Sequence, residues 1–315
     1  MNNLTETLEI KYPILQGGMG NISNAPLTAA ISEAGALGTI GVGTMGTEEV
    51  ESIIIETKKR TSNPFALNIP IAITPHLPEM VRLVVKHKVP VVSLSAGNPA
   101  PLIPYFHEHG VKVVCVVASR KQAKKAEEAG ADIIVGEGYE AAGINSNLET
   151  TTLALIPQLV DTVSIPVAAA GGIGDGRGLA SMLALGAGGV QMGTRFIATR
   201  EAPFHDHYKA ALLEAIDDST VIVGRSVGKV RRVMKTPYSA ELIRKEKEGV
   251  PAEEFGILTS ETYHRIGALE GKLDQGFING GQVSGLVTDI PSVKELIEKM
   301  VSDAENIFAG LRRVE

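Results

Sequence analysis

The sequence predicts an α/β protein in which a (β/α)₈ TIM barrel carries a small inserted lid after its eighth strand. The first observation is a series of eight short apolar runs that are rich in Val, Ile and Ala. These runs hardly alternate with polar residues, which is typical of parallel strands buried on both faces. The second observation is that helix-like segments separate the runs, as a barrel requires. The third is a pair of glycine turns that end the last two runs.

The eight strands are expected at residues 14–16, 37–42, 65–71, 89–94, 111–117, 132–135, 165–170 and 189–192. The clearest helices between them are expected at residues 26–33, 47–60, 78–86 and 120–128. Gly35, Gly130 and Gly186 follow helix-like segments, and glycine at that position accommodates the left-handed turn into the next strand. A doubly wound sheet is the alternative fold. The glycine turn after the first strand argues against it, because that turn lacks the spacing of a dinucleotide fingerprint.

The regular alternation stops after the eighth run. Charge density rises there, with basic residues at Lys229, Arg231, Arg232 and Lys235, and a run of mixed sign at 244–248 is typical of a solvated helix face. A glycine-rich loop then precedes Pro291, which opens an expected closing helix that runs to residue 308. Because no low-complexity linker interrupts the chain, residues 1–216 and 277–315 are expected to form the barrel. Residues 217–276 are expected to pack over it as a lid.

Composition excludes several classes of function. Aromatic residues make up 4% of the chain, Trp is absent and the net charge is −6, so an electrostatic nucleic-acid binder is not expected. The one cysteine, Cys115, lies within an apolar run and is expected to be a buried small residue rather than a nucleophile. It excludes an internal disulfide and a multi-cysteine metal site, and no metal is predicted. No run is long enough to span a bilayer and the N-terminus lacks a signal-peptide pattern, which favours a cytoplasmic protein.

The two glycine turns indicate a phosphate site. Gly171 and Gly172 end the seventh run, Gly193 and Thr194 follow the eighth, and a helix-like segment comes after each turn. A strand, a glycine turn and a helix start together present backbone N–H groups to an anion. Barrels of this kind build phosphate sites after strands 7 and 8. Glycines that only permit close packing of helix on strand are the alternative, which suits a single turn better than a consecutive pair.

The other loops at the same end of the barrel are rich in glycine and small polar residues. They follow the strands at residues 16–21, 41–44, 68–70, 93–99 and 136–143, and they hold few paired acids or clustered histidines. Such loops suit a flat ligand that the backbone approaches closely, with catalysis carried by a cofactor. Flavin mononucleotide (FMN) fits, with its phosphate at the two glycine turns and its ring across the early loops.

Six motifs in order now make a resemblance specific. They are Gln-Gly-Gly-Met-Gly at 16–20, Asn-Ile-Pro at 68–70, Ser-Ala-Gly-Asn-Pro at 95–99, Glu-Gly-Tyr-Glu-Ala-Ala-Gly at 137–143, Ala-Gly-Gly-Ile-Gly-Asp-Gly at 170–176 and Gln-Met-Gly-Thr-Arg-Phe at 191–196. The chain resembles the nitronate monooxygenase family, also called 2-nitropropane dioxygenases, which is close to the flavin-dependent enoyl-acyl-carrier-protein reductases. The resemblance implies an FMN-binding barrel. The residues expected to bind the cofactor are Gly18, Met19, Asn68, Glu137, Gly143, Gly171, Gly172, Gln191, Gly193 and Thr194.

One departure from the family pattern lies after the sixth strand. Relatives carry a catalytic histidine where this chain has Ile144, which can neither donate nor accept a proton. Asn145, the next residue, and His76, which follows the third strand on the expected active face, are the remaining catalytic candidates. Glu140 is a weaker candidate for orienting a ligand. Structural or surface roles are expected for the other histidines, which are His87, His107, His109, His205, His207 and His264.

The resemblance implies an FMN-dependent enzyme that oxidises alkyl nitronates with O₂ to a carbonyl compound and nitrite. An NAD(P)H-dependent enoyl-acyl-carrier-protein reductase is the alternative, and residues 148–153 look closer to that branch. A flavin-binding protein with reduced catalysis is a hypothesis of another class. A nucleotide-dehydrogenase barrel ranks lowest, because it needs a cysteine in a mobile loop whereas Cys115 lies in a predicted strand. The expected partner is a small-molecule nitronate or enoyl thioester, with O₂ or NAD(P)H as flavin partner and a homodimer left open.

Overall fold

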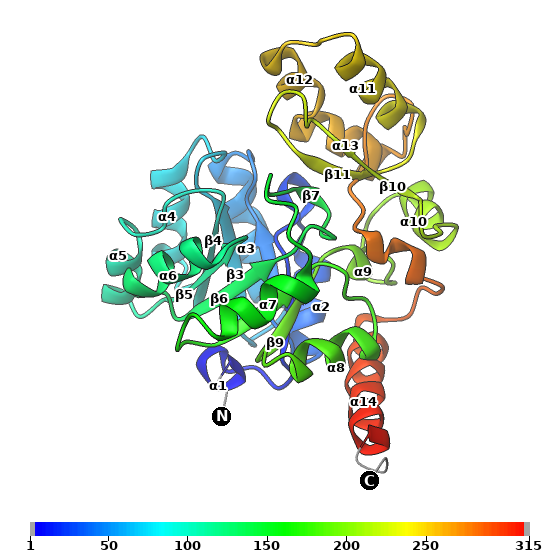
Figure 1. The fold of residues 1–315 in the computed structure, drawn as a ribbon. Helices are drawn as coiled ribbons and strands as arrows, with labels where there is room; N and C mark the ends of the chain where they lie inside the picture. Colours follow the sequence, from blue (N-terminus) through cyan, green and yellow to red (C-terminus); the bar gives the residue numbers. More distant parts are fainter. Residues whose placement is uncertain (1–3, 312–315) are drawn as a thin grey trace.

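The computed structural model of this protein describes residues 4–311 (Figure 1). All eight predicted strands are present. They are β1 (Ile14–Gln16), β2 (Gly38–Gly41), β3 (Phe65–Pro70), β4 (Val91–Ser95), β5 (Lys112–Val117), β6 (Ile133–Glu137), β8 (Val167–Ala170) and β9 (Gly189–Met192).

These strands form one parallel sheet that closes on itself. Their order is β1-β9-β8-β6-β5-β4-β3-β2, and a parallel bridge between Leu15 and Leu37 joins the two ends. At this seam the N–H of Gln16 donates to the carbonyl oxygen of Leu37 at 2.8 Å, and the N–H of Leu37 donates to that of Ile14 at 3.0 Å. The predicted (β/α)₈ barrel is therefore confirmed.

The helices of the barrel alternate with its strands. The four predicted with most certainty appear within two residues of their expected bounds, as α2 (Ala25–Glu33), α3 (Thr47–Arg60), α4 (Leu77–Lys86) and α6 (Arg120–Glu128). The others are α1 (Leu4–Leu8), the 3₁₀ helix η1 (Gly20–Ile22), α5 (Ile103–Glu108), α7 (Thr152–Val160), α8 (Gly176–Ala184), α9 (Thr194–Ile197), α10 (Asp206–Leu213), the 3₁₀ helix η2 (Gln282–Leu286) and the closing helix α14 (Val293–Leu311).

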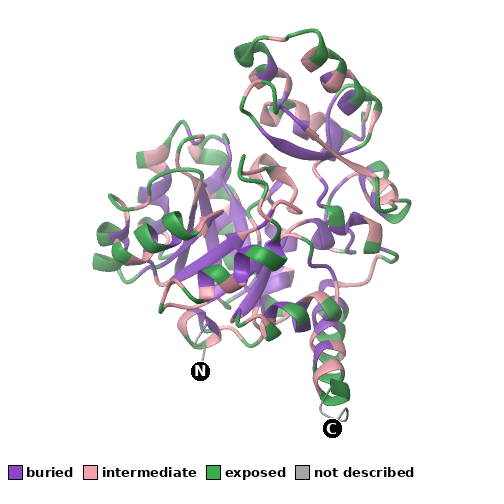
Figure 2. Cartoon of the chain, in the orientation of Figure 1, coloured by how far each residue is buried: buried purple, intermediate pink, exposed green. Residues whose placement is uncertain are grey.

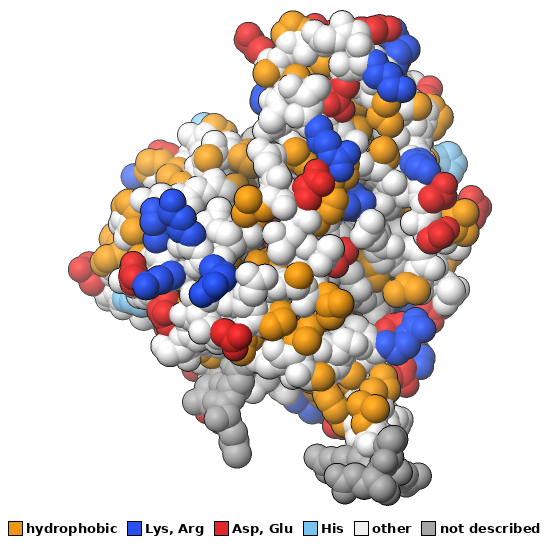
Figure 3. Space-filling view, viewed as in Figure 1, with side chains coloured by type: hydrophobic (Ala, Val, Ile, Leu, Met, Phe, Trp, Pro, Cys, Tyr) orange, Lys and Arg blue, Asp and Glu red, His pale blue; other side chains and the backbone are white. Residues whose placement is uncertain are grey.

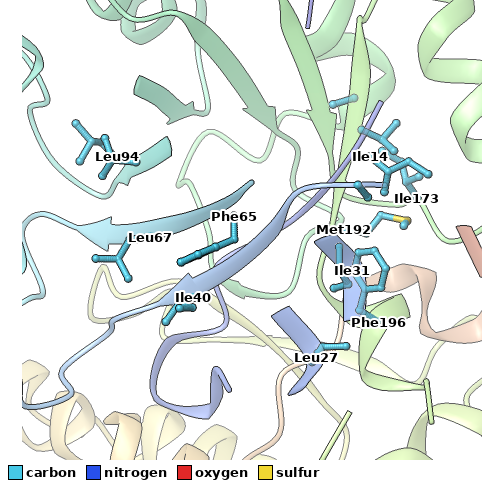
Figure 4. Close-up of a cluster of buried hydrophobic side chains, with 14 of the residues drawn as sticks. Ile14, Leu27, Ile31, Ile40, Phe65, Leu67, Leu94, Ile173, Met192 and Phe196 are labelled. Carbon is cyan, nitrogen blue, oxygen red and sulfur yellow. The ribbon is translucent and has the colours of Figure 1, made fainter. Parts of the chain in front are cut away.

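Side chains of the strands divide between two hydrophobic layers. Because successive residues of a strand point to opposite faces, Ala168 faces the barrel interior whereas Ala169 packs against the surrounding helices. Leu4 and Leu8 of α1 join the interior layer and close the N-terminal end of the barrel. Figure 2 shows the strands buried along their length, and Figure 4 shows part of the outer layer, to which α2 contributes Leu27.

The segment at residues 217–276, called the insertion below, forms a separate lobe at the C-terminal end of the barrel strands (Figure 1). It contains β10 (Thr220–Val223), β11 (Arg231–Met234), α11 (Pro237–Lys247), α12 (Ala252–Leu258) and α13 (Glu261–Glu270). A small core forms around Val223, Tyr238 and Phe255. The predicted solvated helix face is α11, where Arg244 forms ion pairs with Glu241 and Glu248. The domain bounds themselves stay a prediction.

One strand of the insertion comes from the barrel. β7 (Gly143–Ile144) lies in the loop after β6 and pairs antiparallel with β11, so that the small sheet has the order β10-β11-β7. Ile144 lies opposite Arg231 in this ladder, and Gly143 lies opposite Arg232. The loop of Ile144, where the resemblance implies a histidine in relatives, is thereby fixed to the insertion.

Surface and burial agree with the expectations from composition. Acidic and basic side chains are interspersed on the face shown in Figure 3. Cys115 is 1% exposed, and burial raises the pKa of its thiol to about 12, so it is not a nucleophile. Within residues 4–311, none of the helices combines the length and apolar character that a membrane crossing would require.

Candidate active site

A cavity of about 410 Å³ opens between the C-terminal ends of the barrel strands and the insertion. Every one of the predicted cofactor-binding residues lines it. They are Gly18, Met19, Asn68, Glu137, Gly143, Gly171, Gly172, Gln191, Gly193 and Thr194. Loops that follow all eight barrel strands contribute to its wall. The fold therefore brings together motifs that lie up to 176 residues apart in the chain, from position 18 to position 194.

The two glycine turns leave backbone donors free at one end of this cavity. Gly171 and Gly172 adopt the left-handed φ angles +101° and +74°, which favour glycine. The N–H groups of Gly172, Gly193 and Thr194 donate to no group within residues 4–311, and no side chain caps α9. A Cβ on Gly193 would meet nothing within 4 Å, so this backbone borders open space. Free donors around open space fit a phosphate.

Two polar contacts brace these turns. The carboxylate of Glu140 accepts from the N–H and Oγ1 of Thr152 at 2.9 and 3.0 Å, and Thr152 Oγ1 also contacts the carbonyl oxygen of Gly171 at 3.0 Å. Thr194 Oγ1 accepts from the N–H of Gly281 at 3.0 Å. Glu140 therefore caps α7 and supports a glycine turn, and the late glycine-rich loop at 279–285 holds the second turn in place.

Gly18 and Asn68 form a tight contact on another wall. A Cβ on Gly18 would lie 2.2 Å from Asn68 Oδ1, so a larger residue does not fit without displacing the amide. Asn68 Nδ2 donates to the carbonyl oxygen of Ser93 at 3.2 Å and to Ser95 Oγ at 3.3 Å, which fixes that amide. A wall of backbone and one immobilised amide suits the approach of a planar ring.

Glu137 brings a carboxyl group into the cavity with no hydrogen-bond partner among the described residues. Burial raises its pKa to about 7, because the charged form loses hydration that no protein donor replaces. Its charge state therefore changes near neutral pH, a property common in functional sites.

Of the two catalytic candidates, Asn145 lines the cavity and His76 does not. Asn145 lines the cavity, but its Nδ2 donates to the carbonyl oxygen of Ala141 at 2.8 Å, so its amide also holds the loop. Ile144 also lines the cavity and is 48% exposed. His76 is exposed at the start of α4 and does not line the cavity. His87 and His107 pair with Glu51 and Asp132, away from the cavity.

The insertion and the loop that follows it add a wall of polar side chains that no sequence motif indicates. Arg231, Glu261 and His264 of the insertion line the cavity, as does Asn279 of the following loop. His264 is 2% exposed, and its Nδ1 lies 3.3 Å from Glu261 Oε2 while its Nε2 lies 3.2 Å from Asn279 Nδ2. Its ring also stacks on Phe277 with centroids 5.2 Å apart. The basic cluster at 229–232 and the run 279–285 were visible in the sequence, but neither pattern indicates which side chains face a cavity.

Glu261 gives this wall a pH dependence. Burial alone would raise its pKa, but His264 and Arg231 hold it down at about 2, from an ordinary value of 4.5. A lowered carboxyl pKa stabilises the fold above the ordinary value, and that stabilisation is lost as the pH falls towards the folded-state value. The difference corresponds to about 3 kcal/mol, of which about 2 kcal/mol is gone at about pH 3.

We expect Glu261→Gln to destabilise the protein at neutral pH. The difference in unfolding free energy between this variant and wild type should become smaller as the pH falls. Urea unfolding of both proteins at about pH 7 and about pH 3 measures this, since the gap in unfolding free energy should shrink by about 2 kcal/mol. A gap that stays constant over this range would show that Glu261 keeps its ordinary pKa in the folded protein.

A barrel with free backbone donors around a glycine-lined cavity suits a flavin, and the comparisons with known proteins place the chain among the flavin-dependent oxidoreductases. A family model described as nitronate monooxygenase matches residues 1–79 and 72–303. The chain belongs to the nitronate monooxygenase family.

Three proteins similar to this chain differ in the activity that their names state. FabK from Thermotoga maritima has a structure with a TM-score of 0.94 and 39% identity, covering 99% of this chain and 98% of that one. A (3aS,4S,5R,7aS)-5-hydroxy-7a-methyl-1-oxo-octahydro-1H-indene-4-carboxyl-CoA dehydrogenase from Mycobacterium tuberculosis (strain ATCC 25618 / H37Rv) is 33% identical, with 96% of this chain and 95% of the relative covered. A probable nitronate monooxygenase from Staphylococcus aureus (strain MSSA476) is 32% identical, with 98% of each chain covered.

Proposed function

We propose that this protein is an FMN-dependent enzyme that oxidises alkyl nitronates with O₂ to a carbonyl compound and nitrite. The observation that carries the proposal is the exposed apolar side chain of Ile144 on the cavity wall. A neutral nitroalkane must lose its α-proton to a positioned base before it is oxidised, and isoleucine is no base. A nitronate has already lost that proton, so it needs only to be bound and oriented.

The residues of the cavity divide into two tasks under this proposal. Gly172, Gly193 and Thr194 would bind the phosphate through their free backbone N–H groups, in turns that are shaped by Gly171 and supported by Glu140. The remaining predicted cofactor residues hold the ring, and they are Gly18, Met19, Asn68, Glu137, Gly143 and Gln191. The bound flavin supplies redox chemistry between the nitronate and O₂. The insertion, which lines the same cavity, would limit the entry of water to the bound cofactor.

The cofactor prediction is direct. Purified protein is expected to be yellow and to release FMN in a ratio near one per chain when it is denatured, because the site offers donors for a single phosphate. Chromatography of the released flavin distinguishes FMN from FAD. Stoichiometric FAD, or colourless protein that ignores added FMN, would overturn the assignment.

A second candidate is an enoyl-acyl-carrier-protein reductase that uses NAD(P)H. The 39% identity with FabK favours it. The replacement of the family histidine does not argue against it, because water can protonate an enolate after hydride transfer. Rapid mixing of the FMN-loaded protein with a nitronate, NADH or NADPH separates the two functions. Flavin bleaching by the nitronate, with nitrite released under air, supports the proposal. Rapid bleaching by NADPH without nitronate turnover would favour the reductase.

A further inference from the structure

Arg231 is a buried cation in the cavity whose hydrogen-bonding capacity is unused. Its side chain is 10% exposed, and the nearest carboxylate oxygen, on Glu261, lies 3.9 Å from Nη1. This distance is too long for a hydrogen bond, and the guanidinium donates to no other group within residues 4–311. Arg231 also lines the cavity. The group thus keeps its five donors without a hydrogen-bond acceptor in a buried place, where only the long ion pair with Glu261 balances its charge.

Two other buried arginines of this fold do have hydrogen-bond acceptors. Arg232, the next residue, donates to the carbonyl oxygen of Tyr139 at 3.0 and 3.1 Å and to Thr220 Oγ1 at 3.1 Å. Arg195 donates to the carbonyl oxygens of Ala198 and Asp289 at 3.2 Å and pairs with the Asp289 carboxylate. Successive strand residues point to opposite faces, so Arg232 fastens the outer face of β11 whereas Arg231 is directed at the cavity.

The contacts of Arg231 are made with parts of the cavity wall other than the two glycine turns that are expected to bind phosphate. It lies over the ring of Phe277 at 4.8 Å and opposite Ile144 in the β7–β11 ladder. Glu261, its distant partner, approaches the loop after β1, where a Cβ on Gly20 would lie 2.8 Å from the carboxylate. Residues directly opposite in an antiparallel ladder point to the same face, so Ile144 and Arg231 share one patch of the cavity wall. None of these neighbours belongs to a glycine turn.

We propose that Arg231 binds the anionic head of the substrate, a planar group with two oxygens such as a nitronate. The planar fork of a guanidinium matches two such oxygens, and burial strengthens the contact. The ring of Phe277 beneath keeps the fork in one plane, and Ile144 beside it offers an apolar surface to the alkyl part. This inference rests on the proposed function for the identity of the substrate, but the anion site itself is tested separately.

Inorganic nitrate is the probe, because it is planar, carries the negative charge on oxygen and cannot be oxidised. It is titrated into FMN-loaded protein at constant ionic strength with chloride, and binding is followed by the change in visible flavin absorbance. Arg231→Gln is expected to raise the nitrate Kd at least 10-fold, with Arg231→Lys intermediate because an ammonium lacks the fork. Glu261→Gln is expected to lower the Kd several-fold, because it removes a competing negative charge. The control Arg225→Gln removes an exposed arginine of the insertion and should leave the Kd unchanged.

Several results would overturn the inference. One is a nitrate Kd that is the same in Arg231→Gln as in wild type, and another is loss of FMN from Arg231→Gln, which would assign the guanidinium to the cofactor phosphate. If Arg231→Gln does not fold, the other two variants test the inference. The nitrate Kd should then rise in Arg231→Lys and fall in Glu261→Gln, and unchanged values in both would overturn the inference. Nitrate binding that depends on Arg231 in a protein that leaves nitronates untouched would refute the proposed function alone. If the protein oxidises nitronates and the KM is the same in Arg231→Gln as in wild type, this inference alone is refuted.

Discussion

Ile144→His is expected to raise turnover of neutral nitroalkanes about 100-fold, in line with the usual contribution of a positioned general base. The position is suited to such a base because Ile144 is 48% exposed on the cavity wall. It also lies opposite Arg231 in the ladder, and a neighbouring positive charge keeps an imidazole neutral and ready to accept a proton. Nitrite release from matched neutral and pre-ionised substrates, under air, measures the effect.

The gain should be confined to the neutral form. Pre-formed nitronates need no proton abstraction, so their turnover should change little in Ile144→His. Ile144→Gln is the matched control, because glutamine is polar and hydrogen-bonds but is not a base near neutral pH. Efficient turnover of neutral nitroalkanes by the wild-type protein would contradict the argument. Another base would then act, with His264 and Glu137 to test in the cavity and His76 outside it.

Gly193→Val should weaken FMN binding by an order of magnitude or more, which is about 1.4 kcal/mol. The added side chain would project into the open space beside Gly193, where the phosphate is expected. The backbone there has a negative φ of −119°, so it is not a left-handed position that requires glycine, and a Cβ would meet no atom within 4 Å. The variant should therefore fold. Its FMN Kd follows from quenching of flavin fluorescence, and its stability follows from thermal unfolding of the cofactor-free protein.

Gly310→Val is the matched control for this substitution. A Cβ at Gly310 also meets nothing within 4 Å, but the residue lies on α14 and does not line the cavity. Its FMN affinity should equal that of wild type. Equal affinity in a folded Gly193→Val protein would place the phosphate elsewhere.

The barrel was predictable because its strands are buried on both sides. Ala168 and Ala169 belong to different hydrophobic layers, and the sequence shows this as an apolar run without alternation. The glycine turns were equally visible, because Gly171 needs a left-handed backbone that glycine alone adopts readily. Both signals are local in sequence.

What the sequence could not reveal depends on contacts between distant residues. β7 is a two-residue strand, too short for any period, and it exists because β11 pairs with it. In the sequence Arg231 and Arg232 belong to one basic cluster, whereas the ladder turns them to opposite faces. Glu140 lines the cavity, and its carboxylate also caps α7 through Thr152, a contact that no sequence pattern indicates. No local pattern distinguishes such pairings.

The pairing of β7 with β11 couples entry of the substrate to the geometry of the reaction. If the insertion rotates away from the barrel with its sheet intact, it must pull the loop of Ile144 and Asn145 along, since Asn145 also donates its N–H to the carbonyl oxygen of Val230 at 3.0 Å. Opening the cavity and dismantling its wall are then a single movement. A chimera that exchanged the insertion with that of a relative would have to exchange this loop as well, because the two function as one part.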